Sequence, residues 1–261
     1  MPRPRNPGAA GSEELSELPV TAGGLAMRAT LSALLLLCTA SAALAGPGAA
    51  PRTTVVELYT SEGCSSCPPA EAQLEALARQ DGVVALAFHV DYWDDLGWHD
   101  RFGLKEAVTR QRLYAQRLHL ASVYTPQLVI DGQRDQVGGG GLGAAVPVGS
   151  PAPAVVPQIA TGADRIEVSL AAGPSPGACD VLLIGYLPEA TSKVTRGENA
   201  GRELHEFNIV RSLSILGRWQ GEARRFTVPL TALPSDATAV AVLVQRQDQG
   251  PILGAASRAL R

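Results

Sequence analysis

The chain has 261 residues, of which 46% are hydrophobic and 18% are charged, and its formal net charge is −3. This composition is typical of globular proteins and excludes a disordered chain. The length is enough for one large core or two ordinary ones, and we expect two. Because the net charge is slightly negative and no dense cluster of Lys and Arg occurs, nucleic acid and acidic membrane surfaces are not expected as partners.

Residues 1 to 45 are typical of an upstream extension followed by a secretory signal peptide. A positive start at Arg28 precedes an apolar run over residues 31 to 37 and a small-residue signal that ends at Ala45. Since the run is shorter than the ~20 apolar residues that span a bilayer, we expect cleavage near Ala45 rather than a membrane anchor. Lipidation at Cys38 is an alternative. The mature protein is then exported, periplasmic or extracellular, and free of the membrane.

The first elements of the mature chain predict a β-α-β unit. Residues 54 to 60, TVVELYT, form an apolar, β-branched run that indicates a buried strand. Apolar residues at helical spacing predict a helix over 70 to 80, with Glu71 on its solvent face. The run VVALAFHV over 83 to 90 is typical of a strand buried on both faces.

A hairpin completes the first predicted domain, over residues 54 to 145. An acidic and aromatic loop from 91 to 103 leads to a helix over 104 to 120. Two short strands then flank Asp131-Gly132, which is a strong hairpin signal. We expect an α/β domain, a β-α-β unit plus a β-hairpin.

A Pro-, Gly- and Ala-rich linker over 146 to 162 separates this domain from a β-rich one over 163 to 261. Six short apolar runs bounded by turn residues predict a mostly antiparallel β-sandwich there. These runs cover residues 166 to 170, 181 to 187, 207 to 216, 225 to 230, 239 to 245 and 252 to 257.

Cys64 and Cys67 lie in the segment TSEGCSSCPP, between the first strand and the first helix. A zinc site needs two further ligands, which the spacing does not specify. A structural bridge across two residues constrains little of the unfolded chain, because its entropic effect grows with loop length. A redox-active pair is therefore favoured. The alternatives are a non-catalytic binding protein with a structural disulfide, or a soft-metal site for copper or zinc.

As a redox pair, the two cysteines would have different roles. Helix starts lower a thiol pKa from about 8.5 to about 7 or less, which favours the attacking thiolate at Cys64. Cys64 then forms a mixed disulfide with a protein or thiol substrate, and Cys67 resolves it. This requires a Cys64 sulfur that is reachable from solvent. No cofactor is expected besides the disulfide, and an upstream redox partner restores the pair.

The order of a β-α-β unit with CxxC after its first strand, then Thr125-Pro126 and a hairpin, resembles the thioredoxin superfamily. The resemblance implies a cis Pro126 beside the cysteines, and a backbone at Thr125 and Pro126 that pairs with the substrate strand. The dipeptide alone favours the alternative, a trans proline at the strand entry. Ser65-Ser66 replaces the Gly-Pro of thioredoxin, and Pro68 delays the helix start, which weakens the helix-dipole effect on Cys64.

Four longer segments resemble an exported bacterial family of unknown function, domain of unknown function 1223, which pairs a thioredoxin-like domain with a β-rich C-terminal domain. The resemblance spans residues 54 to 260. The segments are VVELYTSEGCSSCPPAEAQL, AFHVDYWDDLGWHD, RQRLYAQRLHLASVYTPQLVIDG and TRGENAGRELHEFNIVR. It implies that the charged turn over 196 to 202 contacts the first domain or a partner.

Further candidates lie near the end of the second strand. His89 and Asp91 fall where α/β sheets place their ligands, and they could relay protons or simply cap the strand. Tyr92, Trp93 and Trp98 could form an apolar wall for a protein substrate, or anchor the loop to the core.

One charged residue and one further thiol are assigned lesser roles. Glu62 places a negative charge near Cys64 that opposes thiolate formation. Cys179, just before an apolar run, is typical of an inert buried thiol.

Overall fold

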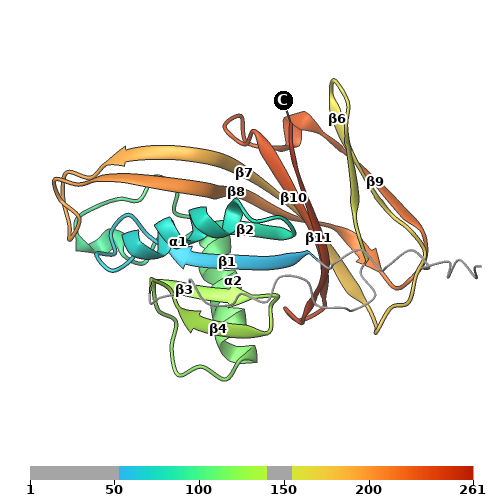
Figure 1. Cartoon of the computed structure of the whole chain (residues 1–261), viewed down its shortest axis with the longest axis horizontal. Coiled ribbons are helices and arrows are strands. Elements are labelled where there is room, and N and C mark those ends of the chain that lie inside the picture. The colour runs from blue at the N-terminus through green and yellow to red at the C-terminus, as the bar shows by residue number, and fades with distance from the viewer. Residues whose placement is uncertain (1–52, 140–154, 261) are drawn as a thin grey trace, which may run out of the picture. The chain divides into compact units, whose positions relative to one another are not determined.

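A computed structural model describes residues 53 to 139 and 155 to 260 (Figure 1). The expected signal peptide, with its cleavage site near Ala45, lies outside these residues, as does the expected linker up to residue 154. Among the residues that are described, no helix is long and apolar enough to cross a bilayer.

The elements of the first half match those predicted from the sequence. They are β1 (Thr54–Thr60), α1 (Pro68–Ala78), β2 (Val83–His89), the 3-10 turn η1 (Asp94–Leu96), α2 (Lys105–Arg117), β3 (Gln127–Ile130) and β4 (Arg134–Val137). Strands β1 and β2 are parallel, and β3 and β4 form the predicted hairpin. Its turn requires positive φ at Asp131 (52°) and Gly132 (66°), where a Cβ on Gly132 would lie 2.8 Å from the Gly250 carbonyl oxygen.

The second half is built of strands, two of them much longer than predicted. They are β5 (Gln158–Thr161), β6 (Arg165–Leu170), β7 (Cys179–Lys193), β8 (Glu203–Trp219), β9 (Arg224–Pro229), the 3-10 turn η2 (Leu230–Ala232), β10 (Ala239–Arg246) and β11 (Ile252–Ala259). Strands β7 and β8 form one long antiparallel hairpin. Strand β5 lies in the segment expected to be linker.

Strands of both halves join in one mixed eight-stranded sheet, in the order β11-β10-β7-β8-β2-β1-β3-β4 (Figure 1). The junction is between β2 and β8, which are parallel and pair Ala87 with Ile209. The Asn208 side chain adds a hydrogen bond from its Nδ2 to the Ala85 carbonyl oxygen, at 2.9 Å. A separate sheet of β5, β6 and β9 packs on the second half through a core that includes Ile166, Val240 and Trp219.

The expected fold class, an α/β thioredoxin-like domain followed by a mostly antiparallel β-sandwich, is therefore wrong. The described chain is mostly β, with two α-helices, and β7, β8, β10 and β11 extend the sheet of the first half instead of forming their own sandwich. Local patterns indicate which residues form strands. They do not specify that β2 accepts β8, because pairing between distant segments depends on tertiary packing.

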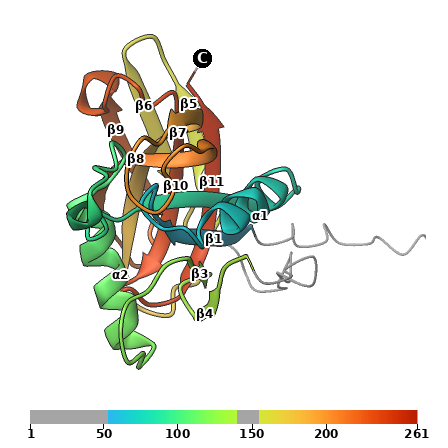
Figure 2. The same ribbon diagram turned by 90° about the vertical axis from the view of Figure 1, so that its left-hand side faces the viewer.

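The two helices cover opposite faces of β1, as Figure 2 shows. Alternate residues of this fully buried strand point to opposite faces. Leu58 packs with Leu74 of α1, whereas Tyr59 packs with Phe88 and with Tyr114 of α2. This arrangement fixes the direction of β1, and therefore the place of the loop that contains the cysteines.

A buried charge network joins the two halves. Arg110 of α2 is 5% exposed, and its Nε lies 2.6 Å from Oε1 of Glu57 on β1. Its NH2 group donates to Oε1 of Gln245 on β10 at 2.9 Å and to the Tyr114 hydroxyl at 3.0 Å. Because a buried charge is tolerated only when paired and hydrogen-bonded, these partners from three elements must assemble together.

We expect Arg110→Met to lower the free energy of unfolding by about 3 to 5 kcal/mol, since it leaves the Glu57 carboxylate buried and unpaired. Urea unfolding of the variant measures this loss. The control is Arg165→Met, whose ion pair with Asp164 is exposed and should contribute at most about 1 kcal/mol. Equal losses in the two variants would contradict a central role for Arg110.

Candidate functional site

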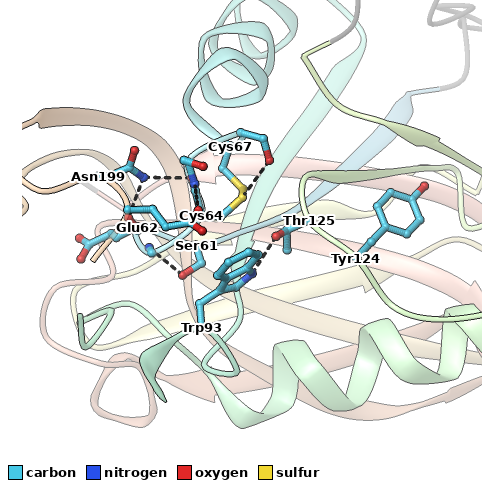
Figure 3. The surroundings of a disulfide bond; sticks show 12 residues. Ser61, Glu62, Cys64, Cys67, Trp93, Tyr124, Thr125 and Asn199 are labelled. Carbon is cyan, nitrogen blue, oxygen red and sulfur yellow. Dashed lines mark hydrogen bonds between the residues drawn. A yellow bond between two sulfur atoms is a disulfide. The ribbon is translucent and has the colours of Figure 1, made fainter. Parts of the chain in front are cut away.

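The candidate site is the loop between β1 and α1, where Cys64 and Cys67 form a disulfide with their Cα atoms 5.4 Å apart (Figure 3). Cys67 precedes the first residue of α1, and Pro68 and Pro69 begin the helix, as the sequence indicated. Prolines have no N–H group, and the next two, those of Ala70 and Glu71, both donate to the Cys67 carbonyl oxygen. None of the first four residues of α1 therefore offers a backbone N–H group to Cys64.

Both cysteines are buried, with exposed fractions of 0% for Cys64 and 1% for Cys67. The expectation of a Cys64 sulfur reachable from solvent is therefore wrong for this conformation. The residues between them, Ser65 and Ser66, are exposed, and the Ser66 hydroxyl lies 3.3 Å from the Cys64 sulfur. Exchange with a substrate requires the groups that cover the sulfurs to move.

Trp93 and Thr125 lie on one side of the disulfide (Figure 3). The indole Nε1 of Trp93 donates to the Thr125 hydroxyl at 2.8 Å, and the Cβ of Trp93 would lie 3.0 Å from a Cβ added to Gly63. The Thr125–Pro126 bond is cis, as predicted. It immediately precedes β3, which pairs with β1, so the sequence-distant Thr125 is brought beside the cysteine loop.

The tip of the β7–β8 hairpin contacts the cysteine loop from another side. Asn199 is fully buried, and its Nδ2 donates to the carbonyl oxygens of Glu62 and Cys64, both at 2.9 Å (Figure 3). The backbone N–H of Ser65 donates to Oε2 of Glu198 at 3.1 Å. The turn over 196 to 202 thus contacts the first half of the chain, which is one of the two roles expected for it.

The other aromatic residues of the acidic loop have different partners. The Tyr92 hydroxyl donates to Oε1 of Gln111 on α2 at 3.3 Å. The Trp98 indole donates to Oε2 of Glu62 at 2.6 Å. Of the three expected to form a wall, Trp93 is therefore the one beside the disulfide, and Tyr92 anchors the loop to α2.

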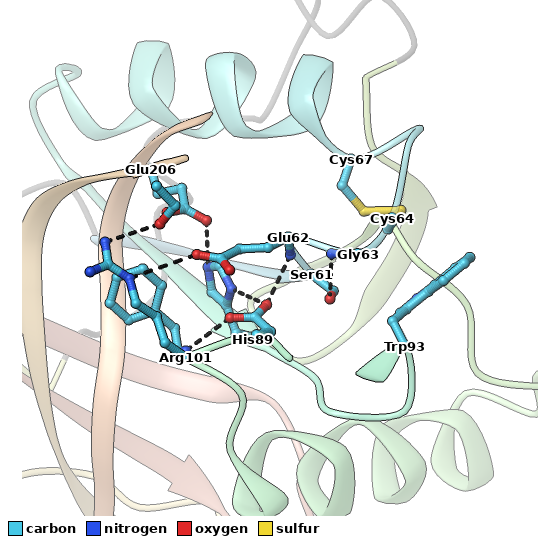
Figure 4. Close-up of polar contacts among 12 residues, drawn as sticks. Ser61, Glu62, Gly63, Cys64, Cys67, His89, Trp93, Arg101 and Glu206 are labelled. Carbon is cyan, nitrogen blue, oxygen red and sulfur yellow. Dashed lines mark hydrogen bonds and ion pairs between the residues drawn. A yellow bond between two sulfur atoms is a disulfide. The ribbon is translucent and has the colours of Figure 1, made fainter. Parts of the chain in front are cut away.

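His89 belongs to a buried polar cluster next to the cysteine loop (Figure 4). Its Nδ1 lies 2.8 Å from Oδ2 of Asp100, and its Nε2 lies 3.9 Å from Oε1 of Glu206. Burial lowers the pKa of His89, but the Asp100 charge and hydrogen bond outweigh this and raise it to about 10. The partner of His89 is thus Asp100, whereas the predicted Asp91 is half-buried beside Gly103.

Two buried glutamates share a cavity with Cys67. The cavity, of about 490 Å³, lies between α1 and the start of β8, and Cys67, Glu71 and Glu206 all line it. Burial raises the pKa of Glu71, and it raises the pKa of Glu206 to about 8. Glu71 is 6% exposed, so its expected place on the solvent face of the helix is wrong. Strand β8 covers that face of α1.

Asp100, Glu71, Glu206 and Asn199 are the residues of the site that sequence reasoning missed. Asp100 is one of several acids in its loop, and Glu71 and Glu206 look like ordinary exposed charges beside apolar neighbours. The charged turn over 196 to 202 was a candidate contact, but the sequence did not indicate that Asn199 within it binds the cysteine loop.

Cys179 is buried, and burial raises its pKa, in agreement with an inert thiol. Over residues 53 to 139 and 155 to 260, no group of three or more His, Cys, Asp or Glu side chains is arranged to hold a metal ion.

Removal of the Trp93 cover is expected to speed reduction of the disulfide by a water-soluble phosphine. Trp93→Phe loses the hydrogen bond to Thr125, of about 0.5 to 1.5 kcal/mol, which corresponds to a reaction faster by a factor of roughly 2 to 13. Trp93→Ala also loses the ring and should react faster still. Thiol titration over time measures the rates. Tyr124→Phe is the control, since it loses a hydrogen bond to Asp135 of β4 only, and an equal effect there would contradict a specific role of Trp93.

Glu206 should give the stability a pH dependence of defined sign. Its pKa is raised from 4.5 to about 8, so between these values the folded chain holds one proton more than the unfolded chain. The contribution of Glu206 to the free energy of unfolding is therefore complete below about pH 4.5 and falls as the pH rises through this interval, by at most about 1.4 kcal/mol per pH unit. Urea unfolding between about pH 5 and 8 should show a shallower fall for Glu206→Gln. The exposed Glu189→Gln should keep the slope of the wild type.

Two solved structures resemble the chain. A crystal structure of protein AGR_C_4864 from Agrobacterium tumefaciens is 28% identical with a TM-score of 0.68, and the match covers 81% of this chain and 96% of that one. HBP35 of Porphyromonas gingivalis is 14% identical with a TM-score of 0.52, and the match covers 82% of this chain and 76% of that one. At 14% identity the likeness concerns the fold alone.

The comparison with curated proteins found no match. The family described as "Protein of unknown function (DUF1223)" matches residues 55 to 245, which are most of the chain. The chain therefore belongs to the DUF1223 family, as the resemblance of its segments implied.

Proposed function

We propose that the mature, exported protein is a thiol-disulfide oxidoreductase that acts through Cys64 and Cys67. The observation that carries the proposal is the setting of the disulfide. A bridge across two residues contributes little stability, yet this one lies between the Trp93–Thr125 contact and a cavity lined by buried acids. Perturbed titratable groups gathered around a reactive pair are typical of functional sites.

The proposed reaction conserves electrons between two disulfides. In the reduced protein, the Cys64 thiolate attacks one sulfur of a substrate disulfide and expels the other as a thiolate. The Cys67 thiolate then attacks the Cys64 sulfur of the mixed disulfide, which releases the second substrate thiolate. Two electrons pass from the cysteine pair to the substrate, and an external dithiol partner restores the pair. The same steps run in reverse for substrate oxidation, and no cofactor enters them.

The buried acids can accept the proton that the Cys67 thiol must lose. Glu71 and Glu206 line the same cavity as Cys67, and burial raises the pKa of both. A general base works best when its pKa is close to the ambient pH, which suits Glu206 with its pKa of about 8. In the proposed mechanism these carboxyl groups are mostly protonated at neutral pH, and their ionised fraction accepts the proton of the resolving cysteine, on the opposite side from Trp93.

The second candidate function is a binding protein in which the disulfide is inert. The observation that favours it is the burial of both cysteines, because a sealed sulfur cannot be attacked. The two candidates differ in the reduction potential of the couple. Structural bridges have potentials below about −300 mV, and exchanging pairs have higher ones.

An insulin-reduction assay tests the proposal. The wild type should be active, and both Cys64→Ser and Cys67→Ser should lose turnover, because the cycle needs both thiols. Cys179→Ala is the control and should retain activity. Equilibration of the wild type with glutathione or dithiothreitol gives the potential. Equal rates in the wild type and Cys64→Ser, or a potential below about −300 mV, would leave the inert bridge as the better reading.

A further inference from the structure

The hairpin tip that contacts the cysteine loop does more than hold it in place. We propose that Glu198, positioned by Asn199, shifts the Cys64–Cys67 couple toward the disulfide by withholding a hydrogen-bond donor from the Cys64 thiolate and by placing a negative charge beside it. Both are positioning residues that act through the loop. The inference rests on the proposed function for its biological meaning, although the equilibrium it concerns can be measured without that function.

Asn199 attaches the hairpin tip to the cysteine loop. Asn199 spans Gly63 by donating to the carbonyl oxygens of Glu62 and Cys64, and its own Oδ1 accepts from NH1 of Arg202 at 3.0 Å. Both hydrogens of its amide and one oxygen lone pair are thus in use inside a fully buried side chain. This three-way contact fixes where the neighbouring Glu198 can lie.

Few backbone hydrogen-bond donors are available to the Cys64 sulfur. A thiolate is stabilised by nearby N–H groups, and a short CxxC loop offers few of them. The Cys64 N–H donates to the Ser61 carbonyl oxygen, and the Cys67 N–H donates to the Cys64 carbonyl oxygen. Pro68 and Pro69 have no N–H. The Ser65 N–H, directly after Cys64, donates to Glu198.

The Glu198 carboxylate also places a negative charge near Cys64. Hydrogen bonds from Ser65 lower the pKa of Glu198, so the carboxylate stays ionised at neutral pH. A like charge near a thiol disfavours its ionised form. The dithiol state has such a thiolate and the disulfide state has none. Glu198 therefore destabilises the reduced form, in the opposite sense to oxidants whose reduced form is stabilised.

The variants Glu198→Gln and Glu198→Ala separate the charge from the hydrogen bond. Glutamine removes the charge and keeps an acceptor for the Ser65 N–H, whereas alanine removes both. Because Glu198 is exposed, we expect Glu198→Gln to favour the dithiol by roughly twofold to fivefold at low salt and by much less at about 1 M salt. Glu198→Ala should retain part of its effect at high salt. The equilibrium with glutathione near pH 8 measures both.

The rate of Cys64 alkylation against pH, in a Cys67→Ser background, provides a second readout. Glu198→Gln should lower the apparent pKa of the Cys64 thiol, which a purely structural contact would not do. Glu189→Gln is the charge-matched control on the same hairpin, since Glu189 acts on Arg79 at the far end of α1. It should leave the equilibrium and the pKa unchanged.

A double-mutant cycle tests the role of Asn199. In an Asn199→Ala background the tip is released, so Glu198→Gln should have little further effect on the couple. If Asn199→Ala does not fold, the single Glu198 variants by themselves test the inference. An unchanged equilibrium and alkylation pKa in Glu198→Gln would overturn the inference, even if the wild type exchanges disulfides. A potential below about −300 mV with a clear Glu198 effect would instead overturn the proposed function and leave this inference standing.

Discussion

The buried guanidinium of Arg110 is the constraint on which the rest of the structure depends. Glu57 of β1 compensates the charge, and Gln245 of β10 accepts a further hydrogen bond, so the guanidinium has all of these partners only when the two halves of the chain are together. Removing a charge from water costs several kcal/mol unless partners replace the lost hydration. This requirement ties the strand that leads into the cysteine loop to a strand that follows it by about 180 residues in sequence.

The candidate site is likewise assembled from segments far apart in sequence. The cysteines follow β1, Trp93 comes from the loop after β2, Thr125 precedes β3, and Asn199 belongs to the β7–β8 hairpin. Each contact restrains a loop that has no regular structure of its own. The surroundings of the disulfide are therefore a property of the whole sheet rather than of the CxxC motif, which explains why sulfurs on a short surface loop can be fully buried.

Much of the local structure could be predicted from the sequence, because it depends on neighbouring residues. Apolar runs and turn residues located the helices and nearly all strands, whereas the cis bond at Thr125-Pro126 was expected only from the resemblance to the thioredoxin superfamily. The fold class could not be predicted, since nothing in residues 83 to 90 specifies that β2 pairs with β8. The burial of Glu71 and Cys64 was missed for the same reason, because β8 and the tip that includes Asn199 cover them.

The parallel contact between β2 and β8 also limits how this polypeptide can be divided. A shortened chain that lacked β8 would leave the edge of β2 without the strand that pairs with it at Ala87, and the side chains of β2 are nearly all apolar. An unpaired strand edge of this kind is a template on which other copies can add strands and form aggregates. Soluble expression of the cysteine-containing half by itself is thus disfavoured by the same geometry that positions its loop.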